Sequence, residues 1–171
     1  VDEFVHRETY LDVSGREMID IITGHDPENP IAIDTEGLLN SDWYWSIQVA
    51  LTPGTSFTLR ASQPDFGIGI SAIRTHCLSN AEPTTFIHSA MHDFNVCRQM
   101  GLDLFDCCLF DTRYAAYVQR VEPQGLKALA RRHLGMKMKD YKEVVGGRAD
   151  EKQIDYLMSI LEYHEATGWD P

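Results

Sequence analysis

The sequence predicts an α/β domain in which a mixed β-sheet is covered by helices. The chain has 171 residues, 43% of them hydrophobic and 24% charged, which is a globular composition with enough length to bury a core. Short apolar runs of strand type come first, and segments with helical periodicity interleave with them later. This alternation favours a single layered α/β architecture.

The first 30 residues are expected to form a strand and a helix that extend the domain. A short strand is predicted at Tyr10–Val13. Ser14 then has the position of a helix N-cap, with Glu17 three residues later and Gly24 at the end of the apolar pattern. The segment His25–Pro30 is polar and is expected to be a connector.

Four strands are expected in the next part of the chain, which contains short apolar and β-rich runs. They are Ile31–Ile33, Ser46–Leu51, Ser56–Leu59 and Thr84–Ile87. The Pro53-Gly54 pair between the second and third of these strands is a hairpin signal.

Five helices are expected where apolar residues recur at intervals of three and four. They are Phe66–Leu78, Ala90–Met100, Thr112–Val118, Leu126–Leu134 and a last helix capped by Asp150. In the first of them two glycines weaken the helix, but Ile68, Ala72 and Ile73 keep helical spacing. A further apolar strand, Cys107–Phe110, precedes the third.

Charge is unevenly distributed along the chain. The net charge is −11, but the segment Lys127–Arg148 carries +5 and the remainder carries −16. An acidic body with one basic segment suits an enzyme that gathers cations and still contacts an anion. Arg131, Lys137 and Lys139 are then candidate contacts to a phosphate backbone. A solvated charged surface is the equally weighted alternative.

The cysteines and the hydropathy pattern indicate a reducing, cytoplasmic location. No apolar run approaches the ~20 residues that span a bilayer. The four cysteines lie in apolar stretches without a C-x-x-C pair, which favours buried thiols over disulfides or a zinc site. The chain begins at Val1, and we expect a fragment or a processed product.

Two carboxylates follow the apolar strand at Ile31–Ile33. Asp34 and Glu36 are two residues apart, so on a strand they share one face while Thr35 faces away. Paired carboxylates at a sheet edge suit Mg²⁺ or Mn²⁺. Asp93 follows another strand and lies in the first turns of a predicted helix, where it is either a third metal ligand or a carboxylate favoured by the helix dipole.

These segments together resemble the DEDD superfamily of 3′–5′ exonucleases. Ile31–Gly37 looks like the first motif, and His88–Asp93 resembles the second, H-N-x-x-[FY]-D. Phe110–Thr112 resembles the "DT" element and Gln124–Ala130 the helix beyond it. The match runs from about Tyr10 to Leu134 and is closest to the proofreading domain of phage-type family A DNA polymerases.

The resemblance implies an RNase H-like fold, with an exonuclease domain over residues 31–171 that is incomplete at its C-terminus. It implies two Mg²⁺ or Mn²⁺ ions, with Asp34 bridging both, Glu36 on the nucleophile side and Asp93 on the second ion. The residues expected to contact substrate are Thr35, Gly37, Leu38 and His88. The expected partners are a single-stranded DNA 3′ end and a polymerase domain of the same or an associated chain, in the host cytoplasm if the protein comes from a phage, without a membrane.

Two departures from the family pattern leave alternatives open. Ser89 stands where asparagine is usual, and His92 where phenylalanine or tyrosine is usual. The third motif, Y-x-x-x-D or H-x-x-x-x-D, which supplies the fourth acid and the residue that orients water, is not found. An RNA-trimming relative and a catalytically silent module that binds nucleic acid or braces a polymerase therefore remain alternatives.

Several other residues are given structural interpretations. Asp111 resembles a family element that is usually structural, and Tyr114 and Tyr117 are expected to be core residues. The histidines His25, His76 and His133 are scattered along the chain and indicate no metal cluster.

Overall fold

A computed structural model describes residues 9–26, 28–37, 43–79 and 85–138. The chain divides into two compact units, residues 1–122 and 123–171. The first unit holds the sheet and all but one of the described helices, and the second holds α5 (Leu126–Leu134).

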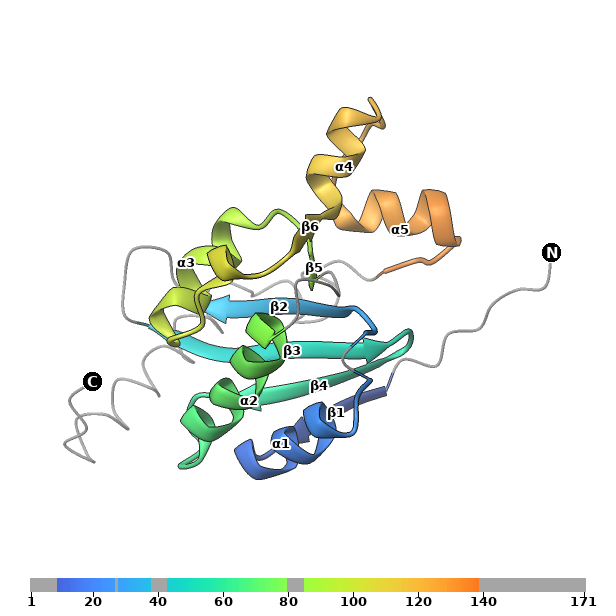
Figure 1. Cartoon of the computed structure of the whole chain (residues 1–171). Coiled ribbons are helices and arrows are strands. Elements are labelled where there is room, and N and C mark those ends of the chain that lie inside the picture. Colours follow the sequence, from blue (N-terminus) through green and yellow to red (C-terminus); the bar gives the residue numbers. More distant parts are fainter. Residues whose placement is uncertain (1–8, 27, 38–42, 80–84, 139–171) are drawn as a thin grey trace, which may run out of the picture. The chain divides into compact units, whose positions relative to one another are not determined.

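The first unit is built on one mixed sheet of six strands (Figure 1). Its strands, in chain order, are β1 (Thr9–Val13), β2 (Ile31–Gly37), β3 (Tyr44–Thr52), β4 (Thr55–Arg60), β5 (Thr85–Ile87) and β6 (Leu109–Asp111). They lie in the order β1-β4-β3-β2-β5-β6. The pairs β2–β3 and β3–β4 are antiparallel, and the other pairs are parallel.

The two N-terminal helices pack against each other beside the sheet (Figure 1). Helix α1 (Gly15–Thr23) opens with a complete capping box between Ser14 and Glu17. Helix α2 (Phe66–Ser79) approaches α1 and β4 closely at Gly69. A Cβ added to Gly69 would lie 3.1 Å from the Gly15 Cα and 2.6 Å from a Leu59 methyl. This glycine, which weakens the helix signal in the sequence, therefore permits the packing.

The remaining elements of the first unit follow β5. Helix α3 (Met91–Gln99) packs beside β2, and the 3₁₀ turn η1 (Leu104–Asp106) and strand β6 lead to helix α4 (Thr112–Val118). The core is formed by buried apolar side chains of the sheet and the surrounding helices. Its fully buried members include Met18, Ile31, Ile47, Val49, Leu59, Ile73, Val96 and Leu102.

Most predicted elements are confirmed, with differences in extent. Strand β2 continues to Gly37 instead of ending at Ile33, and β6 covers Leu109–Asp111 instead of Cys107–Phe110. Helix α2 buries Phe66, Ile70 and Ile73, whereas Ile68 is exposed. The helix expected after Asp150 lies outside the described residues.

The cysteine prediction is correct only in part. Cys97 is buried, but Cys107 is half-buried and Cys108 is exposed, and both lie before the first residue of β6. Among the described residues there is no helix with the length and apolar character needed to cross a membrane.

Candidate active site

The last residues of β2 alternate between the core and the solvent. Ile33 and Thr35 are buried, whereas Asp34 and Glu36 are exposed on the other face of the strand. The alternation follows from the period of two along a strand. It gives Asp34 and Glu36 the shared face that the sequence predicts.

Asp93 is held against the same stretch of β2. Its side chain is only 3% exposed, and its Oδ1 accepts hydrogen bonds from the Thr35 backbone N–H at 3.0 Å and from the Thr35 hydroxyl at 2.8 Å. Within β2, only Ile31 and Ala32 pair with β5, so the edge of β2 at Thr35 is left for α3 to cover. The first turn of α3 thus brings Asp93 to the backbone between Asp34 and Glu36.

Partial loss of hydration acts on all three carboxyl groups, and repulsion by neighbouring carboxylates acts on Glu36 and Asp93. Loss of hydration is the main cause that raises the pKa of Asp34, Glu36 and Asp93. Asp34 further raises the pKa of Glu36 and of Asp93, so the three groups lie within electrostatic range of one another. The folded protein therefore holds three carboxylates whose charge is unfavourable in the absence of a cation.

The donor set fits a divalent cation in its chemistry. Carboxylate oxygens are the ligands that Mg²⁺ and Mn²⁺ prefer, and a cation would offset the repulsion among Asp34, Glu36 and Asp93. The side chains are not already arranged around an ion, because no three His, Cys, Asp or Glu side chains of the described residues form a group that could hold one. Their assignment as metal ligands thus stays a prediction.

His92, which the sequence marks only as a departure from the family motif, lies next to these carboxylates. It acts electrostatically on Asp34, Glu36 and Asp93, and in each case it opposes the rise in pKa. The available signal was its position directly before Asp93 in α3.

His88 stands on the turn between β5 and α3. Its Nδ1 lies 2.8 Å from the Thr112 hydroxyl, which itself donates to the Ile87 carbonyl at 3.2 Å. Because a hydroxyl has one proton, Nδ1 must be the donor to Thr112. Burial is the main cause that lowers the pKa of His88, which leaves Nε2 of the neutral ring as an acceptor.

Asp111 fixes this turn and the start of α4 together. Its Oδ1 accepts from the backbone N–H groups of Ser89, Arg113 and Tyr114, and its Oδ2 accepts from that of Ala90. Burial acts to raise the pKa of Asp111, but these backbone donors outweigh it and the pKa is lowered. Four bonds to the backbone agree with the structural interpretation of this residue.

The predicted substrate-binding residues have different positions in the structure. Thr35 is buried and bonded to Asp93. Gly37 ends β2 where an added Cβ would lie 2.9 Å from a Val96 methyl. Arg131 and Lys137 are exposed residues of the second unit, and Leu38 and Lys139 lie outside the described residues.

One expectation about other side chains is wrong. Tyr114 and Tyr117 are not core residues, because their side chains are 66% and 63% exposed on α4. His25 and His76 are far apart in the sequence, and the fold brings their rings together with centroids 5.3 Å apart, which does not bear on the expectation that the histidines form no metal cluster.

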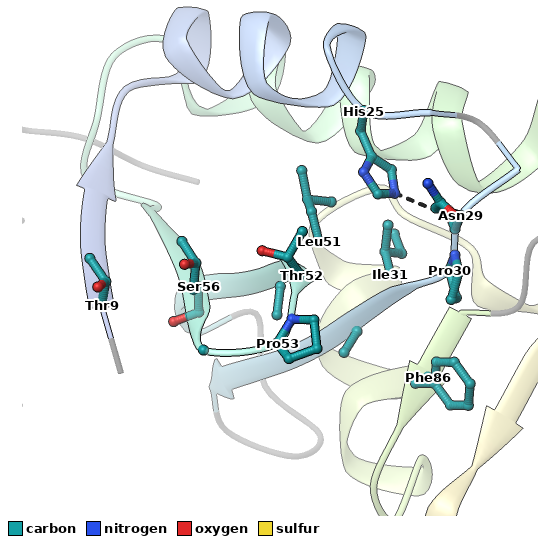
Figure 2. A pocket seen from close by; sticks show the side chains of 14 residues that line it. Thr9, His25, Asn29, Pro30, Ile31, Leu51, Thr52, Pro53, Ser56 and Phe86 are labelled. Carbon is teal, nitrogen blue, oxygen red and sulfur yellow. Dashed lines mark hydrogen bonds between the residues drawn. The ribbon is translucent and has the colours of Figure 1, made fainter. Parts of the chain in front are cut away.

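A separate cavity of about 680 Å³ lies at the opposite end of the sheet (Figure 2). It is lined where β2 begins and β3 ends, by Ile31, Leu51 and Thr52 among others. No carboxylate, lysine or arginine is among the described residues that line it. Asp34, Glu36 and Asp93 therefore do not line this cavity.

Comparison with solved structures identifies the fold. No protein-family model and no curated protein matches the sequence. The catalytic core of RRP6 from Trypanosoma brucei aligns with 82% of this chain at 15% identity and a TM-score of 0.64. The Aedes aegypti Nibbler EXO domain aligns with 82% of this chain at 13% identity and a TM-score of 0.59. The POL domain of Pol1 from M. smegmatis aligns with 77% of this chain at 18% identity and a TM-score of 0.62.

The chain spans 38% of the RRP6 structure, 74% of the Nibbler domain and 23% of the Pol1 chain. Together with the six-stranded mixed sheet and its flanking helices, these alignments show an RNase H-like α/β fold. This is the fold class that the resemblance to DEDD-type exonucleases predicts.

Proposed function

We propose that this chain is a metal-dependent 3′–5′ exonuclease domain that removes nucleotides from the 3′ ends of DNA. The observation that carries the proposal is the pair of hydrogen bonds by which Thr35 holds Asp93 beside Asp34 and Glu36. The fold supports it, since an EXO domain and a nuclease are among the proteins with similar structures.

Asp34, Glu36 and Asp93 would hold two divalent ions, whose chemistry is to activate a water and to stabilise the leaving 3′-oxygen. The residues of this chain would position those carboxylates and the substrate. Thr35 holds Asp93 through two hydrogen bonds, and His92 lies close enough to act electrostatically on all three acids. His88, with Nε2 as an acceptor, is suited to accept a hydrogen bond from water or from a sugar hydroxyl near Asp34.

The finer proposal is that the domain proofreads for a DNA polymerase. It is supported by the order of the motifs in the sequence and by the similarity to Pol1, whose structure contains a DNA primer-template. The polymerase itself would be a further domain or an associated chain. The basic segment Lys127–Arg148 would follow the phosphate backbone of the single strand.

A catalytically silent nucleic-acid-binding module is the second candidate. It is favoured by the observation that no three candidate ligands of the described residues are arranged to hold a metal. The absent third motif in the sequence favours it as well. The two candidates differ in whether a divalent ion causes hydrolysis.

The test follows the release of nucleotides from a single-stranded DNA with Mg²⁺ or Mn²⁺. A strand labelled at its 5′ end should shorten stepwise from the 3′ end, and a strand with a blocked 3′ end should stay intact. Asp34→Asn should abolish the shortening, whereas Asp20→Asn, an exposed acid on α1, should leave it unchanged. An RNA strand run in parallel decides between DNA and RNA.

Stepwise release that starts at the 5′ end would refute the proposal. A folded protein that shortens neither the DNA nor the RNA strand with either ion would also refute the proposal. The catalytically silent module would then be the remaining candidate.

A further inference from the structure

Helix α4 begins directly beside the turn that carries His88. The Arg113 guanidinium donates from Nη1 to the Ser89 hydroxyl at 2.9 Å, and Asp111 bonds to the backbone at both ends of this contact. The charges of Arg113 and Asp34 both act on the His88 ring. A cation is therefore fixed next to the candidate active site, on the side from which α4 leaves it.

The side chains that follow Arg113 on α4 are aromatic and accessible. Tyr114 and Tyr117 are 66% and 63% exposed, and their rings are stacked with centroids 6.2 Å apart and planes 27° apart. Of the α4 residues only Ala116 is buried. The two rings thus present flat apolar faces to solvent, whereas rings that served to pack the core would be buried.

The charges around these rings favour an anionic partner. Arg113 and Arg120 are exposed on either side of the tyrosines, in a chain whose net charge is −11. Asp111, the carboxylate at the N-cap of this helix, already accepts four backbone hydrogen bonds. Arginine beside accessible aromatic rings is the combination that binds single-stranded nucleic acid, through phosphate contacts and base stacking.

We propose that Arg113, Tyr114, Tyr117 and Arg120, here called the α4 surface, bind the single strand whose 3′ end enters the candidate active site. Arg113 contacts a phosphate close to the reacting end, and bases further along the strand stack on the two tyrosines. The direction of entry rests on the proposed function, but binding at the α4 surface does not require hydrolysis.

The experiment measures binding of two labelled strands of equal length in EDTA, where hydrolysis cannot interfere. One strand is oligodeoxythymidine, and the other has the same phosphates but abasic sugars. The wild-type full chain should bind oligodeoxythymidine more tightly than the abasic strand, because only the former has bases to stack.

Replacing both tyrosines with leucine should weaken binding of oligodeoxythymidine about tenfold and leave the abasic strand unchanged. The double phenylalanine variant should keep the wild-type affinity, because it retains the ring faces. Arg113→Gln should weaken the binding of both strands and reduce the slope of log affinity against log salt by about 0.7. Phe105→Leu is the matched control, since Phe105 is an exposed ring on η1, at the other end of α3.

Full affinity for oligodeoxythymidine in the double leucine variant would overturn the proposal, because it would show that the bases do not stack on the two rings. A large loss of melting temperature in that variant without nucleic acid would overturn it too, because it would place the tyrosines in a packed interface. These outcomes are separate from the proposed function, which fails if the wild-type protein binds the strand but does not shorten it with Mg²⁺ or Mn²⁺.

Discussion

Replacing Asp111 with alanine removes one carboxylate that accepts four backbone hydrogen bonds. The two bonds to Arg113 and Tyr114 form the N-cap of α4, and loss of such a cap costs about 1 kcal/mol. The two bonds to Ser89 and Ala90 are half-buried and add about 1 to 2 kcal/mol. The free energy of unfolding should therefore fall by about 2 to 3 kcal/mol.

The measurement is denaturant unfolding in EDTA, with Asp103→Ala as the matched control. Asp103 caps the short turn η1 through one bond to the Phe105 N–H at 3.0 Å, so its loss should cost less than about 1 kcal/mol. A loss at Asp111 no larger than the loss at Asp103 would refute the argument that one carboxylate joins the β5–α3 turn to α4.

The same variant has a defined pH dependence. The folded pKa of Asp111 is lowered below the ordinary 3.8, since its backbone donors outweigh the effect of burial. Its contribution to stability is thus complete above the unfolded pKa and is lost as the pH falls through the folded pKa. The difference in unfolding free energy between wild type and Asp111→Ala should be constant near neutral pH and shrink below about pH 4.

Three further predictions concern β2 and the acids. Thr35→Val removes the hydroxyl bond to Asp93, so the pKa of Asp93 should rise in an NMR titration and the unfolding free energy should fall by about 1 to 2 kcal/mol. Gly37→Ala pushes a methyl against Val96 and should cost about 1 to 3 kcal/mol, measured by denaturant unfolding; an unchanged midpoint would contradict the close approach. The raised pKa values of the three carboxylates make their charged forms destabilising, so stability in EDTA should decrease as the pH rises from the ordinary values of 3.8 and 4.5 through the higher folded pKa values, and Glu36→Gln should reduce that decrease.

Local signals in the sequence were sufficient for most elements. Ser14 and Glu17 form the capping box that their spacing predicts, and Pro53-Gly54 joins two antiparallel strands. The helix over Thr112–Val118 has the bounds expected from its pattern. In each case the decisive contacts are between residues close together in the chain.

The remaining features depend on contacts that no local pattern encodes. Strand β2 extends through Glu36 because its polar end pairs with β3. Asp93 reaches Thr35 across 58 positions of sequence. The alternation of Asp34 and Glu36 was predictable from the strand period alone, whereas the exposure of Tyr114 and Tyr117 depends on what the rest of the fold leaves uncovered.

The most direct test of the account is the change in melting temperature that Mn²⁺ causes in each of four proteins. Wild type and Asp20→Asn should gain stability with Mn²⁺ by mass action on the folded state. Asp34→Asn and Asp93→Asn should gain little, because each removes one of the carboxylates that the ion would neutralise. An equal gain in Asp93→Asn and wild type would contradict the claim that Asp34, Glu36 and Asp93 form one metal site.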